Sequence, residues 1–164
     1  MSLTVEPSFP TRAKATLLLG LGNDILGDDA VGLRIARELG RRLPPDGDAE
    51  AVESCEMGLS LLDLMVGYKK LVLVDSVKSG RAPVGTIHDL PVTDIEILPL
   101  MSPHFFGIGE ILSLGRQLAL PMPQDVRVCA IEVEDPFTVR DTMTPALETE
   151  FPRLVEAILK TVAG

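Results

Sequence analysis

The chain has 164 residues, a hydrophobic content of 46% and a formal net charge of −9, values that suit a single domain with a sizeable core. The scattered Lys and Arg residues argue against a nucleic-acid partner, because nucleic-acid binding needs clustered positive charge. No apolar run approaches the ~18 residues of a membrane span, and the first residues lack the pattern of a secretory signal. We therefore expect a cytoplasmic protein that binds no membrane, with a monomer as the simplest state.

Strand-like and helix-like patterns alternate along most of the sequence. Residues 1–14 are predicted to be a flexible N-terminal extension, and residues 15–164 a single domain. Apolar runs, alternating runs and amphipathic segments predict, in chain order, a strand at 16–19, a helix at 30–43, a strand at 49–54, a helix at 59–66, strands at 71–74 and 85–90, a helix at 102–118, a strand at 126–131 and a helix at 147–162. Such alternation builds a mostly parallel sheet with helices on both faces. The predicted fold is an α/β three-layer sandwich.

The loop after the first strand, GLGNDILGDDAVG at 20–32, begins like a dinucleotide-binding turn. The third glycine of that motif would fall at Ile25, and three aspartates are a poor cradle for a pyrophosphate. In open parallel sheets, ligands bind beyond the carboxyl ends of the strands, where this loop is predicted to lie. Nucleotide binding is therefore the weaker interpretation of the loop.

Three aspartates are candidates for that edge of the sheet. Asp28 and Asp29 precede the first predicted helix, where aspartate is a favoured cap and complements the helix dipole. One cap needs one carboxylate, and adjacent helical residues point about 100° apart, so we expect Asp28 to cap the helix and Asp29 to face the edge. Asp75 closes the central apolar strand, where a carboxylate is costly unless it is paired, hydrated or bound to a cation. Its alternatives are a helix cap or an ion pair with Lys78 or Arg81.

The two histidines receive different interpretations. Ser102 suits a helix N-cap and Pro103 the first helical position, which places His104 in the first turn. The positive end of a helix disfavours imidazolium, so His104 is expected to favour the neutral, metal-binding form. A solvated surface histidine is the alternative. His88 lies in an alternating strand and is expected to be structural or at the surface.

Two carboxylates and a neutral imidazole would form a mixed oxygen and nitrogen site. Borderline divalent ions such as nickel or zinc accept this set and keep positions open for substrate or water. Ligand chemistry alone leaves the choice between these metals open. The sequence contains no HExxH or CxxC pair, so the usual zinc-protease and structural-zinc sites are excluded.

No catalytic nucleophile can be assigned from the sequence. Cys55 lacks a recognisable cysteine-protease context, and Cys129 sits in a predicted apolar strand as a small hydrophobe. Ser54 and Ser60 lack the GxSxG pattern of a nucleophile elbow. Without a secretory signal, the two cysteines also predict no disulfide framework.

Three segments together resemble the hydrogenase maturation endopeptidases: GLGNDILGDDAVGLRIA, LVLVDSV and MSPHFFGIGEIL. Their order and spacing match that family from about Leu17 to the C-terminal helix. The resemblance implies that Asp29, Asp75 and His104 bind a nickel ion carried by the substrate, with zinc or cadmium as substitutes in vitro. It also implies an endopeptidase that removes the C-terminal extension of a nickel–iron hydrogenase large-subunit precursor after nickel insertion.

One segment departs from the family pattern. Better-known members carry a Gly-Thr or Gly-Gly element after the second strand that helps to hold the substrate, whereas this chain has ESCEMG at 53–58. Glu56 and Gly58 are the substrate-binding candidates here, and an ordinary acid at a helix N-terminus is the alternative for Glu56. Because fold and metal site do not prove cleavage, a non-catalytic metal-sensing or chaperone module of hydrogenase assembly is the alternative function. A small-molecule hydrolase or a nucleotide-binding domain comes third.

Overall fold

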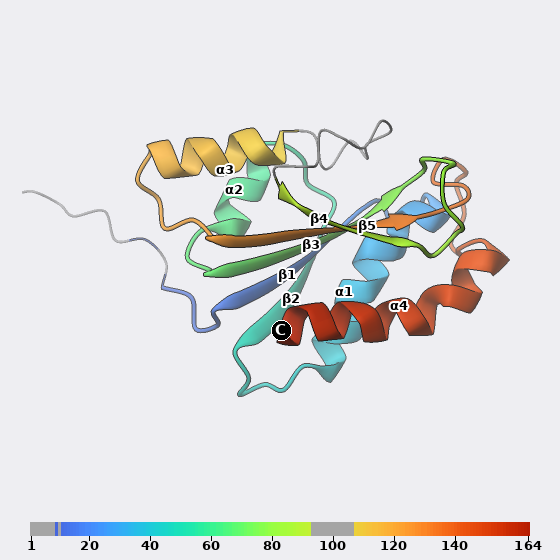
Figure 1. The fold of residues 1–164 in the computed structure, drawn as a ribbon, viewed down its shortest axis with the longest axis horizontal. Coiled ribbons are helices and arrows are strands. Elements are labelled where there is room, and N and C mark those ends of the chain that lie inside the picture. Colours follow the sequence, from blue (N-terminus) through green and yellow to red (C-terminus); the bar gives the residue numbers. More distant parts are fainter. Residues whose placement is uncertain (1–8, 10, 93–106) are drawn as a thin grey trace, which may run out of the picture.

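A computed structural model shows a twisted sheet between two pairs of helices (Figure 1). The structure describes residues 9, 11–92 and 107–164. Within these residues the elements, in chain order, are β1 (Thr16–Leu21), the 3-10 turn η1 (Gly27–Ala30), α1 (Val31–Arg42), β2 (Ala49–Ser54), α2 (Ser60–Met65), β3 (Lys70–Val77), β4 (Ile87–Pro91), α3 (Ile108–Gln117), β5 (Asp125–Glu132) and α4 (Pro145–Ala163). Helices α1 and α4 cover one face of the sheet, and α2 and α3 cover the other (Figure 1).

The strands pair in the order β2-β1-β3-β5-β4. All neighbours are parallel except β4, which runs antiparallel to β5 at one edge. The parallel strands therefore end together, at the right-hand side of Figure 1. This arrangement confirms the predicted single-domain α/β fold with a mostly parallel sheet and helices on both faces.

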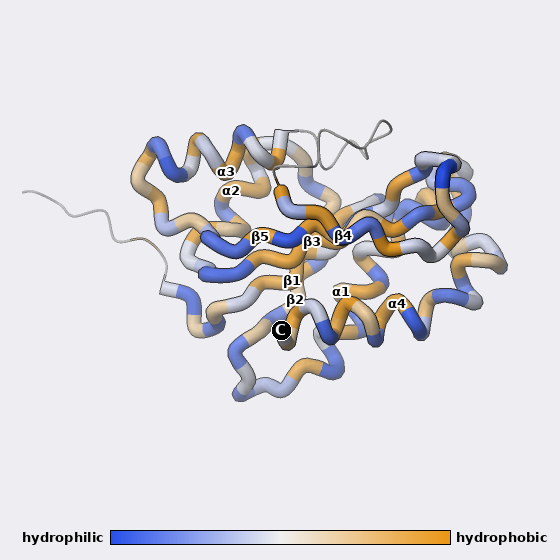
Figure 2. Tube along the Cα trace, viewed as in Figure 1, coloured by the Kyte–Doolittle hydropathy of each residue, from blue (hydrophilic) through white to orange (hydrophobic). Residues whose placement is uncertain are grey.

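The core consists of two apolar layers, one on each side of the sheet. Successive residues of a strand point to opposite faces, so Leu17 and Leu19 of β1 join the layer under α2 and α3. Leu18 joins the layer under α1 and α4. Hydropathic colouring shows the central strands as mainly hydrophobic (Figure 2). Burial of each such leucine contributes on the order of 2 kcal/mol to folding.

Glycines in the first loop and the following helix allow α1 to lie directly on β1. A Cβ atom on Gly20 would be 2.1 Å from the carbonyl oxygen of Gly32. A Cβ atom on Gly32 would be 2.4 Å from the carbonyl oxygens of Leu21 and Val74. The glycines of this segment are therefore explained by close backbone packing, without a bound nucleotide.

Two predicted boundaries are wrong in ways that matter for the site. Strand β3 continues to Val77, so Asp75 lies within the strand and does not close it. The helix predicted at 102–118 begins at Ile108 in the structure, after Gly107 with a left-handed φ of +79°. A residue in that conformation cannot continue an α-helix, so a single helix from Ser102 through this point is excluded.

The start of the described chain lies against the domain. Arg12 donates hydrogen bonds to the carbonyl oxygens of Val66 at 3.0 Å and Asp63 at 2.8 Å, and its guanidinium lies 5.0 Å from the ring centroid of Tyr68. Residues 1–8 and 10 of the predicted extension lie outside the described residues. Among the helices that are described, none has the length and apolar character needed to cross a membrane.

Candidate active site

Asp29 and Asp75 come from different elements and are joined by one serine. The hydroxyl of Ser76 donates to Asp29 Oδ1 at 2.6 Å, and the backbone N–H of Ser76 donates to Asp75 Oδ1 at 2.7 Å. Asp75 is fully buried and Asp29 is 7% exposed. The structure therefore brings two of the three predicted site residues together, near the carboxyl end of β3. Sequence analysis missed Ser76, although its place directly after Asp75 was a usable signal.

A glycine holds the backbone of Asp29 close to the end of β1. Gly22 has a φ of +149°, and a Cβ atom at this position would be 2.1 Å from the carbonyl oxygen of Asp29. Any side chain here would push the η1 turn away from the strand. The second glycine of the GLG segment thus serves to place a carboxylate beside Ser76.

Asp28 does not cap its own helix, and that prediction is wrong. Neither η1 nor α1 has a side-chain cap. The carboxylate of Asp28 instead accepts four hydrogen bonds from the segment between β5 and α4, at 2.6–3.1 Å: from the backbone N–H groups of Glu134, Asp135 and Thr144 and from the hydroxyl of Thr144. Asp28 is fully buried. It therefore ties the η1 turn to the distant loop that begins α4.

Glu132, at the end of β5, forms a second buried carboxylate cluster that sequence analysis missed. It accepts hydrogen bonds from the hydroxyl and N–H of Ser79 and from the N–H of Gly80, and its Oε2 lies 3.0 Å from His88 Nε2. Burial alone raises the pKa of Glu132, but the bonds from Ser79, His88 and Gly80 outweigh it and hold the pKa below its ordinary value. His88 is thus placed in a structural contact. An acid directly after the apolar run at 128–131 was the available signal.

The third predicted ligand, His104, lies outside the described residues. Within residues 9, 11–92 and 107–164, no group of three or more His, Cys, Asp and Glu side chains is arranged to hold a metal ion. The described residues therefore supply two carboxylates to the candidate site. Carboxylate oxygens suit divalent ions, and a mixed set with an imidazole suits borderline ions such as nickel.

Comparisons with known proteins identify the family of this chain. The family model described as hydrogenase maturation protease (HycI) matches residues 33–161. The chain belongs to the hydrogenase maturation protease family. It is 26% identical over 145 residues to the hydrogenase 2 maturation protease of Escherichia coli K12, covering 87% of each chain. It is also 26% identical over 149 residues to the hydrogenase expression/formation protein HupD of Bradyrhizobium diazoefficiens, covering 85% of this chain and 78% of that protein.

The solved structures give the same answer for the fold. The hydrogenase maturating endopeptidase HybD from E. coli superposes with a TM-score of 0.72 at 25% identity, and the match covers 90% of this chain and 91% of that chain. Hydrogenase maturation proteases are endopeptidases, which are hydrolases, and they act on hydrogenase precursors. Fold and family therefore agree with the resemblance stated from the three sequence segments.

Among the substrate-binding candidates, the structure places Glu56 and Gly58 in the loop between β2 and α2. Glu56 is exposed and precedes α2, which begins at Ser60. It is therefore not an acid within the first turn of that helix. Gly58 has a left-handed φ of +65°, and a Cβ atom there would meet open space. The loop follows the carboxyl end of β2, and Asp75 lies near the carboxyl end of β3, at the same edge of the sheet.

The cysteines of this hydrogenase maturation protease are both free thiols. Cys55 is exposed in the same loop as Glu56, whereas Cys129 is buried in β5. Burial raises the pKa of Cys129 to about 12, so this thiol stays protonated and a poor nucleophile at neutral pH. The expected role of Cys129 as a small buried hydrophobe is confirmed.

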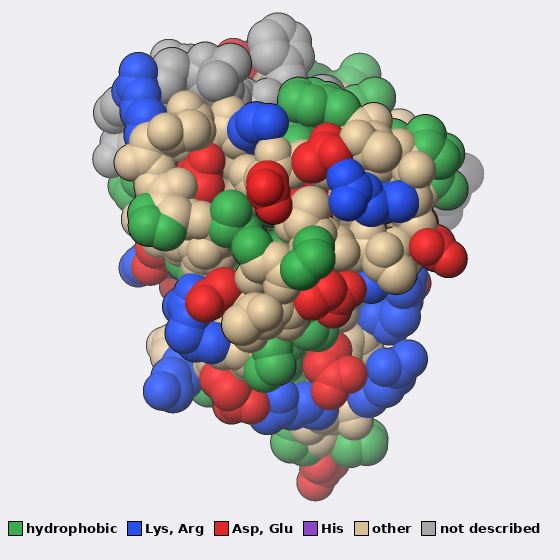
Figure 3. All heavy atoms as spheres, turned by 90° about the vertical axis from the view of Figure 1, so that its right-hand side faces the viewer, with side chains coloured by type: hydrophobic (Ala, Val, Ile, Leu, Met, Phe, Trp, Pro, Cys, Tyr) green, Lys and Arg blue, Asp and Glu red, His purple; other side chains and the backbone are tan. Residues whose placement is uncertain are grey.

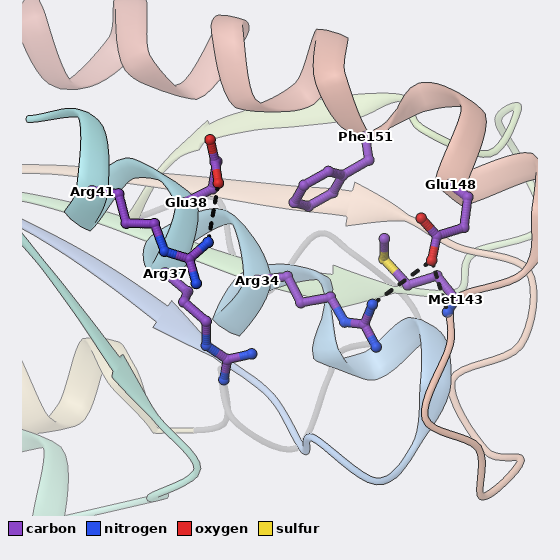
Figure 4. Close-up of a pocket in the computed structure, with 7 residues that line it drawn as sticks. All are labelled: Arg34, Arg37, Glu38, Arg41, Met143, Glu148 and Phe151. Carbon is purple, nitrogen blue, oxygen red and sulfur yellow. Dashed lines mark hydrogen bonds and ion pairs between the residues drawn. The ribbon is translucent and has the colours of Figure 1, made fainter.

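A pocket of about 270 Å³ lies elsewhere, between α1 and α4 (Figure 4). Arg34 and Arg41 line it, but each faces an acid: Arg34 lies 3.7 Å from Glu148 and Arg41 lies 3.4 Å from Glu38. Figure 4 shows these side chains beside the ring of Phe151. Such ion pairs between side chains on the surface of α1 and α4 are ordinary and solvated. The pocket contains neither Asp29 nor Asp75.

Proposed function

We propose that this protein removes the C-terminal extension of a nickel–iron hydrogenase large-subunit precursor after nickel insertion. In this proposal the nickel ion belongs to the substrate. Asp29, Asp75 and His104 bind the ion and thereby recognise the nickel-loaded precursor. The observation that carries the proposal is the pair of buried carboxylates joined through Ser76 in a chain of the hydrogenase maturation protease family. Two buried carboxylates are costly unless they serve as ligands or are compensated by bonds.

The chain's own residues would position the ion and the peptide in separate ways. Asp29 and Asp75 would offer oxygen donors to the nickel, while His104 would offer nitrogen, and open positions would remain for the substrate's own ligands. Gly22 and Ser76 would hold the two carboxylates at a fixed separation. A nickel ion bound in this way can polarise a carbonyl or activate a water molecule. No nucleophile among the side chains is assigned.

The decisive experiment incubates the purified protein with nickel-loaded and nickel-free precursor and follows both by intact-mass spectrometry. We expect the loaded precursor to lose the mass of its C-terminal extension and the nickel-free precursor to keep it. Equal cleavage of both forms would contradict nickel recognition. Tight nickel-dependent binding without any change in mass would instead indicate a metal-sensing chaperone of hydrogenase assembly.

A further inference from the structure

Large hydrophobic side chains that are exposed to solvent gather at one edge of the molecule. Among the described residues there are six, and five of them lie in three loops that follow the carboxyl ends of β1, β2 and β5. These are Ile25 at 61%, Met57 at 53%, Leu59 at 64%, Phe137 at 72% and Val139 at 72% exposure. The sixth, Leu118 at 57%, follows α3. Figure 3 shows this edge face-on, with hydrophobic side chains set among acidic and basic ones.

Single exposed hydrophobic residues are normal on protein surfaces, but three of these share a stiff support. The backbone of Arg140 donates to Ile25 and accepts from Gly27, at 3.0 and 3.1 Å, which joins the loop after β1 to the loop after β5. We call Ile25, Phe137 and Val139 the apolar ridge. The hydrogen-bonded backbone of the two loops therefore holds these side chains at the surface.

A carboxylate turn stiffens the second loop further. Asp135 accepts bonds from the hydroxyl of Thr138, from the backbone N–H groups of Phe137 and Thr138, and from Arg140, and these bonds hold the pKa of Asp135 at about 2. Lys78 lies 5.8 Å from the ring centroid of Phe137. A backbone held this firmly keeps Phe137 pointing outward, which solvent alone would not favour.

Hydrogen bonds also link the segments of the apolar ridge to the turn that carries Asp29. Gly27, whose N–H donates to the carbonyl oxygen of Arg140, lies in the same η1 turn as Asp29. Asp28 in that turn accepts hydrogen bonds from the N–H groups of Glu134 and Asp135. These two residues lie shortly before the ridge residue Phe137 in the chain. A partner that places a group against Asp29 would therefore meet the ridge in the same approach.

Charge on this edge favours one kind of partner. In the loops at the carboxyl ends, Asp24 is paired with Arg37, and the other exposed acids, Glu56, Glu134 and Asp141, still outnumber the exposed bases, Lys78 and Arg81. The chain as a whole carries a net charge of −9. Complementary potentials steer association and fix orientation, so the matching surface is apolar with Lys and Arg at its border.

We propose that the apolar ridge is the docking surface for the folded precursor, which binds it through an apolar patch bordered by basic residues. This inference rests on the proposed function and adds a second contact to it. The ridge supplies affinity for the precursor with or without nickel, whereas Asp29 and Asp75 recognise the nickel ion. Docking and nickel recognition are thereby separate steps at one edge of the sheet.

The test compares an Ile25→Ser/Val139→Ser double variant and Phe137→Ser with Leu118→Ser, an equally exposed residue outside the ridge. Dissociation constants are measured by biolayer interferometry against nickel-loaded and nickel-free precursor, with circular dichroism to verify folding. We expect each ridge variant to bind both precursor forms about 10-fold more weakly, and Leu118→Ser to match the wild type. At saturating precursor, kcat should stay within about 2-fold while KM rises, as for loss of uniform binding.

The outcomes separate the two proposals. Ridge variants that bind as tightly as Leu118→Ser would overturn the docking surface and leave the proposed cleavage standing. A wild type that binds the precursor through the ridge but never cleaves it would end the protease proposal and keep the surface. A wild-type dimer in sedimentation velocity that the ridge variants lose, without any change in precursor affinity, would assign the ridge to a second copy of this chain and overturn its role in docking.

Discussion

The buried carboxylates of the described residues fall into two groups that differ in what they contact. Asp28 and Glu132 each bond to other segments through backbone N–H groups and side chains together, so each fixes a loop. Asp29 and Asp75 instead meet at Ser76. Adjacent positions in one turn, Asp28 and Asp29, thus belong to different groups.

This difference explains why an acidic pair is needed at the start of α1. A carboxylate that accepts several backbone N–H groups is a strong structural link, because charged hydrogen bonds stabilise more than neutral ones. Asp28 uses its oxygens in that way and holds the turn that carries Asp29. One residue of the pair therefore positions the other, and the comparison can be tested by separating loss of stability from loss of processing.

The largest expected effect is loss of processing in the group joined by Ser76. Under the proposed function Asp29 and Asp75 are nickel ligands, so Asp29→Ala and Asp75→Ala should each misplace the nickel and lower the rate of precursor cleavage at least about 100-fold. The same result is expected for His104→Ala. Cleavage is followed by intact-mass spectrometry, and the free energy of unfolding, measured in urea, should stay within about 2 kcal/mol of the wild type.

The matched control for these variants is Asp125→Ala. Asp125 is an exposed acid at the other end of the sheet, where β5 begins. The Asp125 variant should process the precursor at the wild-type rate. Full activity in Asp29→Ala or Asp75→Ala would remove that residue from the site and break the comparison.

The second effect concerns Asp28, for which stability should fall first. Asp28→Ala leaves four donors without their acceptor, and two of these donors belong to the buried residue Thr144. We expect the free energy of unfolding to drop by about 3–5 kcal/mol, because several buried donors lose their acceptor and each costs about 1–3 kcal/mol when it is left unsatisfied. Urea unfolding measures this loss. A drop no larger than that of Asp29→Ala would show that the two aspartates are not divided in this way.

The fold was predictable because its signals are local. The apolar strands and most of the amphipathic helices were predicted correctly from their periods, and the edge strand from its alternation. The exception among the helices is the one predicted at 102–118, because α3 begins at Ile108 after Gly107. The extension of β3 past Asp75 was missed, because a carboxylate ends an apolar run in the sequence, whereas Ser76 and Val77 still pair with β5 in the sheet.

The site was only partly predictable, because its partners are distant in the chain. Asp29 and Asp75 could be placed at one edge from topology alone. The role of Asp28 depends on Glu134, Asp135 and Thr144, more than a hundred residues away. A side chain before a helix looks like a cap in the sequence, and nothing local indicates that a remote loop supplies the donors.

The third effect tests whether Glu132 belongs with Asp28 as a loop anchor. Because its pKa is lowered in the folded state, the unfolded chain binds more protons, so the carboxylate stabilises the fold above pH 4.5 and loses this effect as the pH falls further. Glu132→Gln should be about 1–3 kcal/mol less stable than the wild type at pH 7. The difference should shrink in urea unfolding at a pH below 4.5.

The difference between the two proteins is the informative quantity, because other carboxylates titrate equally in both. His88 contacts Glu132 directly, so a His88→Gln variant should be measured beside it to separate the histidine from the Ser79 and Gly80 bonds. A gap between wild type and Glu132→Gln that stays constant with pH would place the residue outside the anchoring group.

The smallest effect is expected at Cys55, and it bears on where the chemistry lies. The thiol is exposed in the loop that also carries Glu56, and a serine in its place should change the free energy of unfolding by less than about 0.5 kcal/mol. Precursor cleavage by Cys55→Ser should stay within about 2-fold of the wild type, because the thiol lies in the β2–α2 loop, outside the cluster of Asp29, Asp75 and Ser76. A Cys55→Ser protein that is folded, binds nickel-loaded precursor and fails to cleave it would move the reacting group to the β2–α2 loop. Asp29 and Asp75 would then recognise the ion without taking part in cleavage.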